Sequence, residues 1–438
     1  MDTAMTEPSP TLRRALGRWD LTAIGINQVI GGAIFLMPSQ VAAQIGNWSP
    51  VAFVAAGVAS LFVALCFAEV GSRFERTGGP YLYARAAFGR FVAFEVGWMQ
   101  WFTRASSQAA IVNGIALALA FYWPAVRERQ ARVFLIAGLT LVLAVVNVLG
   151  IRQSAWVVNA LTVGKLLPLA VFLAAGMFFI DWRRLTPLPP VTLGQAGAAG
   201  LLLIFTYGGF DVISVPAGEA RDPRRHIPFA FITTIAAVTL IMTLGQIVTM
   251  TTLPDVARST TPMADAAMAF LGPLGALMIG IGSVVSMTGN NAGQVLSGSR
   301  MLFALAEHGE LPGFFGRIHR GYRTPSNAIW FTSAAALALA LSGSFVLMAA
   351  ASAVARLVTY TGVSAATLIL RRPRFRGQVQ PATFVIPWGA TIPVVATLGS
   401  VAILAGASRQ QLLVGSSALA AGALLFAVNH LNNRRRGL

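Results

Sequence analysis

The sequence predicts an all-α membrane protein with about twelve transmembrane helices, of which the first and the sixth are broken. Composition, a series of apolar segments and two pairs of mid-span glycines lead to this prediction. Of the 438 residues, 56% are hydrophobic and only 11% are charged, whereas soluble domains carry about 25% charged residues. No long polar stretch is present that would form a soluble domain.

Apolar segments recur along the chain at lengths near the ~20 residues that cross a bilayer. We expect a polar tail over 1–19 and a basic tail over 431–438, with two extra helices over 388–430. The eighth segment is too long for a simple span, and we expect it to continue as a helix into the cytoplasm. The expected spans are 20–45, 50–72, 91–121, 132–150, 155–180, 196–220, 229–252, 263–305, 327–343, 347–370, 388–406 and 411–430.

The distribution of basic residues orients these spans. A formal net charge of +17 would suit a nucleic-acid-binding protein, but the arginines are dispersed through loops between apolar spans, so we expect no nucleic-acid partner. With both termini inside, the inner loops hold about three times as many arginines as the outer loops, as the positive-inside rule requires. We therefore expect a multi-pass protein of the cell inner membrane with cytoplasmic termini.

Paired glycines interrupt two spans. Gly31 and Gly32 lie in the middle of the first span, and Gly208 and Gly209 in the sixth. A helix unwinds in lipid only where the freed backbone groups meet protein, water or a solute. Either pair alone is explained equally well by close helix packing. Breaks at the first and sixth positions together indicate two inverted five-span repeats, here 20–180 and 196–370, with a solute site between them.

Lys165 is the single lysine among 32 basic residues, and it lies at the centre of the fifth predicted span. Arginine is effectively always protonated, whereas a buried lysine can lose its proton. Two roles are open for Lys165. It carries a coupled proton, which we favour, or it is a fixed cation that replaces a bound sodium ion and braces the helices.

Other polar side chains also fall within spans. In the third span one helical face carries Gln100, Thr103, Arg104, Ser107 and Gln108. A cation as deep as Arg104 needs an anion, either the solute or a carboxylate such as Asp211, which is equally suited to cap the second half of the sixth span. Arg356 either guards the outer vestibule or pairs with an acid that the sequence does not identify. Asn290 and Gln294 share a face of the eighth span.

Enzymatic and metal-dependent functions find no support in the sequence. The histidines at 226, 308, 319 and 430 lack metal-ligand spacing. There is no P-loop motif and no convincing pair of nucleophile and base. We expect no cofactor, no metal and no enzymatic activity.

An ordered set of motifs resembles the amino acid–polyamine–organocation permeases, especially their bacterial amino acid and cationic amino acid branches. The motifs are GGAIF at 31–35, AEVG at 68–71, GGPYLY at 78–83, FTYGGFD at 205–211, EARDP at 219–223, SRMLF at 299–303 and HGELP at 308–312. The resemblance implies a LeuT-like fold with alternating access. It implies that a substrate carboxylate meets the N–H groups of Gly31–Ala33, and an ammonium the carbonyls near Val29 and at Phe205 and Gly208.

The resemblance also assigns individual roles. Phe205 takes the place of an aromatic gate, and Lys165 that of a lysine which replaces sodium in several proton-coupled relatives and also occurs in some exchangers. Ala33 stands where the family usually has a glycine, so its methyl group narrows the carboxylate cradle. Arg104 falls on a pocket position and either selects an acidic side chain or is neutralised by Asp211. We expect Gln294 to contact the solute and Asn290 to support the site.

These observations predict a secondary transporter for an amino acid or a closely related small amine, working as a proton-coupled symporter. The main alternative is an obligate amino acid or polyamine exchanger. A channel-like facilitator and a non-transporting sensor are less favoured. The sequence leaves the substrate and the oligomeric state open.

Overall fold

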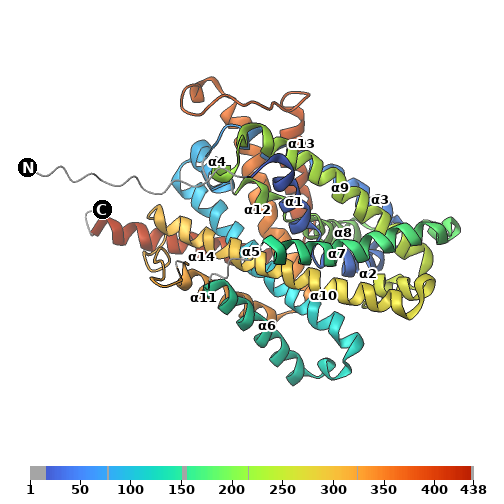
Figure 1. The fold of residues 1–438 in the computed structure, drawn as a ribbon. Coiled ribbons are helices and arrows are strands. Elements are labelled where there is room, and N and C mark those ends of the chain that lie inside the picture. The colour runs from blue at the N-terminus through green and yellow to red at the C-terminus, as the bar shows by residue number, and fades with distance from the viewer. Residues whose placement is uncertain (1–15, 76–77, 150–154, 216, 323, 436–438) are drawn as a thin grey trace, which may run out of the picture.

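A computed structural model shows a bundle of helices (Figure 1) and describes residues 16–435, apart from 76–77, 150–154, 216 and 323. Within these residues there is no β-strand. The helices are α1 (Arg18–Val29), α2 (Ala33–Ile45), α3 (Ser49–Gly71), α4 (Pro80–Phe88), α5 (Arg90–Tyr122), α6 (Arg129–Leu149), α7 (Ala155–Gly176), α8 (Leu193–Thr206), α9 (Pro223–Thr252), α10 (Pro262–Glu307), α11 (Ser326–Ser342), α12 (Phe345–Leu370), α13 (Thr391–Ala405) and α14 (Arg409–Arg435).

Every predicted span coincides with a helix or, for the first, sixth and eighth, with consecutive helical segments. Shorter apolar helices cover 164–179, 326–342 and 391–405. By length and composition, seven stretches of the described chain are able to cross a membrane: 33–71, 129–149, 193–214, 223–252, 262–307, 345–370 and 409–431. The prediction of an all-α polytopic membrane protein is confirmed.

Both predicted interruptions are present. The first span is interrupted between α1 and α2 at Ile30–Gly32. The sixth is interrupted after α8 and continues as the 3₁₀ segment η5 (Phe210–Ser214). Between α8 and η5, Gly209 has a φ of 123°, a conformation that residues with a side chain rarely adopt. The division into inverted repeats over 20–180 and 196–370 stays a prediction.

Helix α10 contains a break that the sequence analysis missed. Gly272 has a φ of 69° and is followed by Pro273, so α10 consists of two helices, 262–271 and 273–307. The second is about 50 Å long at 1.5 Å per residue, which exceeds the ~30 Å hydrocarbon core. We expected the extra length of the eighth span to continue a single helix into the cytoplasm. Part of this length instead forms a separate helix before Gly272. The Gly-Pro pair was the available signal.

Packing brings the two broken spans together. α1 contacts η5, and α2 contacts α8. α5 packs against α10, α11, α12 and α14, so it lies within the bundle (Figure 1). α10 contacts α1 and α2, and α12 contacts α8, so these two helices flank the interrupted spans.

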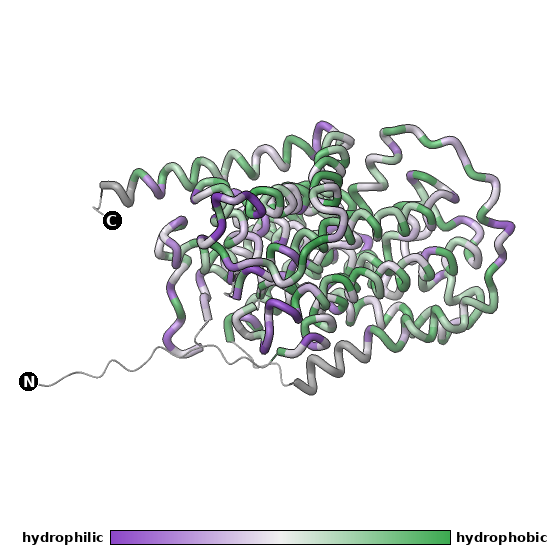
Figure 2. Tube along the Cα trace, turned by 90° about the horizontal axis from the view of Figure 1, so that it is seen from above, coloured by the Kyte–Doolittle hydropathy of each residue, from purple (hydrophilic) through white to green (hydrophobic). Residues whose placement is uncertain are grey.

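The outside of the bundle is covered with apolar side chains. Phe134 on α6 is 77% exposed and Leu274 on α10 is 80% exposed. Hydrophobic residues dominate most helices, and hydrophilic residues gather in loops and at helix ends (Figure 2). Such an apolar surface is unfavourable in water and matches the acyl chains of a bilayer.

Glu69, near the end of α3, ties this helix to the segment that follows α12. Its carboxylate accepts hydrogen bonds from Nε of Arg371 at 2.7 Å, from Nη2 of Arg371 at 2.5 Å and from the backbone N–H of Ile386 at 2.9 Å. The Glu69 side chain is buried, whereas that of Arg371 is partly exposed. Hydrogen bonding to Glu69 raises the pKa of the Arg371 guanidinium above its usual value, so this contact stabilises the charged pair.

The variant Glu69→Gln is expected to lose about 1–3 kcal/mol of stability, because it loses a charge-assisted contact and mismatches the N–H donors around it. Thermal unfolding in detergent measures this loss as a lower melting temperature. The control is Asp181→Asn, whose ion pair with Arg184 at 3.6 Å is exposed and should change stability by about 0.5 kcal/mol or less. Equal melting temperatures for both variants would contradict a stabilising role for the contacts of Glu69 with Arg371 and Ile386.

Candidate functional site

Lys165 on α7 reaches the break in the first span. Its Nζ donates hydrogen bonds to the backbone carbonyls of Asn27 at 2.6 Å and Ile30 at 2.9 Å. The side chain is 3% exposed. Carbonyls at the end of α1 have no helical partner, so the ammonium group supplies donors that the backbone lacks. Both roles considered for Lys165 require its charge to lie at this break.

Helix α10 supplies the other donors to the break. Ser286 Oγ donates to the carbonyl of Gly31 at 3.1 Å, and Asn290 Nδ2 donates to the carbonyl of Gln28 at 2.7 Å. Gln294 Nε2 donates in turn to Asn290 Oδ1 at 3.1 Å. The shared face of Asn290 and Gln294 is thus confirmed by a direct contact, and it is turned towards the interrupted first span.

Asp211 in η5 is held between two guanidinium groups. Its Oδ2 forms an ion pair with Nη2 of Arg104 and accepts a hydrogen bond from Gln100 Nε2 at 3.2 Å. Its Oδ1 accepts from Nη1 of Arg356 at 2.9 Å. Arg104 Nη1 also donates to Gln294 Oε1 at 3.4 Å. A hydrogen-bonded chain therefore runs from the sixth span through α5 and α10 to the first.

The structure resolves several alternatives left by the sequence. Asp211 pairs with two arginines, and it also lies in the first turn of η5, where a carboxylate is favoured. Arg356 pairs with Asp211, a partner that sequence spacing could not reveal. The predicted face of the third span is buried, with every side chain at most 3% exposed, and comprises Gln100, Thr103, Arg104, Ser107 and Gln108.

A small polar cavity of about 20 Å³ lies between the two interruptions. This volume is about enough for one water molecule, so the cavity is too small for an amino acid in this arrangement. Its lining includes residues that the sequence analysis predicted: Val29, Gly31, Gly32, Ala33, Phe205, Gly208, Asn290 and Gln294. It also includes four that were not assigned to the site: Gln28, Ser107, Ile111 and Arg356. Arg104, Lys165 and Asp211 lie outside this lining and brace it.

The backbone around the cavity offers both signs of partial charge. The N–H of Gly31 donates to the carbonyl of Val29 at 2.8 Å, and the N–H of Gly208 donates to the carbonyl of Phe205 at 3.0 Å. Of the three N–H groups assigned to a carboxylate, those of Gly32 and Ala33 lie at the start of α2, where intrahelical acceptors are lacking. This end of a helix favours an anion.

The glycines of the first interruption also permit close packing. A Cβ atom at Gly31 would lie 2.6 Å from Asn290 Nδ2, and one at Gly32 would lie 2.6 Å from Cγ of Met287. Contacts this short do not occur between real side chains and a Cβ atom. The packing explanation of this glycine pair therefore holds, and it is compatible with a binding role for the same residues.

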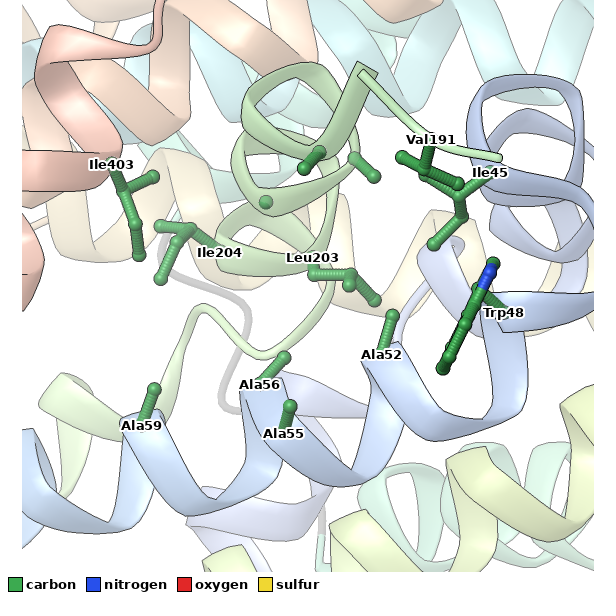
Figure 3. A pocket seen from close by; sticks show the side chains of 13 residues that line it. Ile45, Trp48, Ala52, Ala55, Ala56, Ala59, Val191, Leu203, Ile204 and Ile403 are labelled. Carbon is green, nitrogen blue, oxygen red and sulfur yellow. The ribbon is translucent and has the colours of Figure 1, made fainter. Parts of the chain in front are cut away.

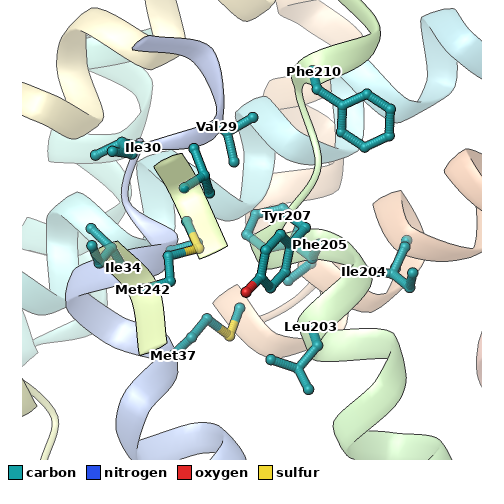
Figure 4. Close-up of a cluster of buried hydrophobic side chains, with 14 of the residues drawn as sticks. Val29, Ile30, Ile34, Met37, Leu203, Ile204, Phe205, Tyr207, Phe210 and Met242 are labelled. Carbon is teal, nitrogen blue, oxygen red and sulfur yellow. The ribbon is translucent and has the colours of Figure 1, made fainter. Parts of the chain in front are cut away.

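Apolar side chains close the site on one side. Phe205 packs edge-on against Phe345 on α12, with ring centroids 6.1 Å apart. Around it, Ile34 and Met37 of α2 lie opposite the segment with Leu203 and Tyr207 (Figure 4). The Tyr207 hydroxyl donates to the carbonyl of Phe53 at 2.7 Å, so the polar end of this ring is satisfied.

A second, larger hollow does not suit a polar solute. It measures about 570 Å³ and is lined by alanines and aliphatic side chains between α3 and α8, with Ile403 of α13 (Figure 3). The indole N–H of Trp48 at its rim already donates to the carbonyl of Pro189 at 2.9 Å. Without polar groups to orient a solute, this hollow fits an acyl chain, and we assign the functional site to the polar cavity.

The variant Asp211→Asn should lower the stability by about 3–5 kcal/mol, because it leaves two buried guanidinium groups without a carboxylate. Thermal unfolding and size-exclusion chromatography in detergent measure the effect. The double variant Asp211→Asn/Arg104→Gln restores the net charge of the cluster and should recover part of the loss. If Asp211→Asn melts at the wild-type temperature, the cluster does not hold the bundle as described.

Comparison with known proteins agrees with this architecture. The chain is 27% identical to the branched-chain amino acid permease BcaP of Bacillus subtilis, over 90% of this chain and 88% of the relative. It is 27% identical to the serine/threonine exchanger SteT of the same organism, over 90% and 91%, and 24% identical to its methylthioribose transporter, over 88% and 87%. Residues 16–428 match the amino acid permease family. The chain therefore belongs to the amino acid permease family and is a membrane transporter, not an enzyme.

Proposed function

We propose that this permease binds an α-amino acid, or a closely related small amine, in the cavity between the interruptions of the first and sixth spans. The arrangement of the cavity carries this proposal: a helix start at Gly32 and Ala33 faces the same small space as the carbonyl-rich end of α1. Such ends favour a carboxylate and an ammonium respectively. Gln294 and Arg356 add side-chain donors to the same lining.

Transport by alternating access fits the small volume of this cavity. A solute larger than a water molecule does not fit a space of about 20 Å³, so binding requires the surrounding helices to separate. We place the hinge at the two interrupted spans, with the units 20–180 and 196–370 moving against each other, as inverted repeats do in related folds. The protein would lie in the inner membrane with cytoplasmic termini.

We further propose that Lys165 couples transport to protons. Its ammonium group bonds to two carbonyls of the interrupted first span, so loss of its proton would weaken these charge-assisted hydrogen bonds and loosen the first span. Protonation from outside and deprotonation inside would then bias the two arrangements in turn. A lysine is suited to this step because, unlike arginine, it is able to lose its proton when it is buried.

Exchange without net uptake is the second candidate, and one relative carries the name of an exchanger. In that mechanism Lys165 remains charged and serves only as a brace. The two candidates make different demands on the side chain: symport needs a cation that loses its proton, whereas exchange needs only a cation. The oligomeric state does not enter either mechanism.

Replacement of Lys165 separates these mechanisms. Lys165→Ala should abolish proton-driven accumulation, and Lys165→Arg, a permanent cation, should retain counterflow but lose accumulation. Uptake and counterflow in proteoliposomes with an imposed pH gradient measure both. The solute is taken from a thermal-shift screen of the twenty amino acids and common amines, in which a hundredfold excess over the dissociation constant stabilises the protein by about 2.7 kcal/mol.

If Lys165→Arg still accumulates the solute, proton coupling through this residue is contradicted. Wild-type protein that shows counterflow but no net uptake would favour the exchanger. If no amino acid or amine shifts the melting temperature, the substrate class itself is wrong.

A further inference from the structure

Arg356, rather than Arg104, presents its guanidinium group to the cavity. Both side chains are buried, but only Arg356 belongs to the cavity lining. It lies against the backbone of the interrupted sixth span, where a Cβ atom at Gly208 would overlap Cζ and Nε of Arg356. Glycine at 208 therefore gives the guanidinium its place beside the cavity.

Two residues of the cavity lining each carry a side-chain donor that has no acceptor within the described residues. Arg356 Nη1 donates to Asp211, but Arg356 Nε is buried and unpaired. The side-chain amide nitrogen of Gln28, which lies on the same lining, is also buried and unpaired. Arginine has five N–H donors and no acceptor, and a buried donor left without a partner is unfavourable. A solute with additional acceptor oxygens would satisfy both groups.

The charges around the cavity favour an anion as well. In the part of the chain that the structure describes, Arg104, Arg356 and Lys165 surround the interruptions with Asp211 as their one paired carboxylate. A positive excess remains even when Lys165 loses its proton. Buried charge of one sign is costly unless a partner neutralises it. A cationic solute would add to this excess, and an anionic one would reduce it.

We propose that Arg356 determines substrate specificity by binding a second anionic group, so that the solute is an acidic amino acid or a dicarboxylate of similar length. The inference rests on the proposed function and specifies its substrate class. The α-carboxylate lies at the start of α2, and the second carboxylate faces Arg356 and Gln28. Because the guanidinium lies against Gly208, the ammonium of an amino acid lies on the side of Val29. Arg104 acts as a positioning residue that holds Asp211.

Binding of four probes to the purified full-length protein tests this assignment. L-Aspartate and L-asparagine have nearly the same shape, and only the first carries a second carboxylate. Succinate carries both carboxylates without the ammonium, and L-lysine carries a second cation. L-Aspartate should bind about tenfold to a hundredfold more tightly than L-asparagine, since hydrogen bonds to charged groups are the stronger ones, and L-lysine should not bind. Succinate binding would show that the ammonium is dispensable.

Two matched variants locate the selectivity. Arg356→Gln removes a charge from the lining, and Arg104→Gln removes the same charge from the same cluster outside the lining. The ratio of asparagine to aspartate dissociation constants should fall to about one in Arg356→Gln, because the carboxylate loses its partner. In Arg104→Gln most of the preference should remain. If a variant fails to fold, the comparison of aspartate with asparagine binding by the wild type still tests the predicted preference for a second carboxylate.

Three outcomes would overturn the inference. Equal or tighter binding of L-asparagine or L-lysine by the wild type would refute it while leaving the amino acid permease function intact. The inference would also be refuted if the preference for aspartate survived in Arg356→Gln but disappeared in Arg104→Gln. Failure of all four probes and of every other amino acid to bind would refute both the inference and the proposed function.

Discussion

The structure depends on how the backbone carbonyl and N–H groups find hydrogen-bond partners where the first span is interrupted. An unwound segment inside a bilayer exposes carbonyl and N–H groups that lipid does not bind. Lys165, Ser286 and Asn290 donate hydrogen bonds to four of these carbonyls from α7 and α10. The N–H groups at the start of α2 have no such protein partner by helix geometry. The side-chain donors thus occupy these four carbonyls, and the N–H groups at the start of α2 remain for an anion.

The same contacts connect the two broken spans. From Asp211 in η5, ion pairs reach Arg104 and Arg356, and from Arg104 hydrogen bonds continue through Gln294 and Asn290 to α1. A displacement of the sixth span therefore acts on the first through discrete contacts. Such contacts have a small number of arrangements, which suits a protein that alternates between two states. Removing the Asp211 carboxylate would leave the charges of two arginines buried without a partner. This series of contacts therefore matters for folding and for transport.

Local sequence patterns predicted the features that depend on short stretches of chain. The glycine pairs at 31 and 208 marked the interruptions, the solitary Lys165 marked the fifth span, and helical periodicity placed Gln294 beside Asn290. Arg356 was not placed, because its partner Asp211 lies 145 residues away in the sequence and periodicity carries no information on such pairs. Gln28 was missed for a similar reason, since its amide is distinguished only by the space it faces.

Cysteine protection tests the central claim that the solute binds in the polar cavity rather than in the apolar hollow. The described part of the chain has a single native cysteine, Cys66, which is buried. Ser107→Cys introduces a thiol on the cavity lining, and Ala56→Cys introduces one in the hollow. The amino acid or amine with the largest thermal shift should slow labelling of Ser107→Cys by a small thiol reagent and leave Ala56→Cys unaffected. Protection of Ala56→Cys alone would contradict the assignment of the site.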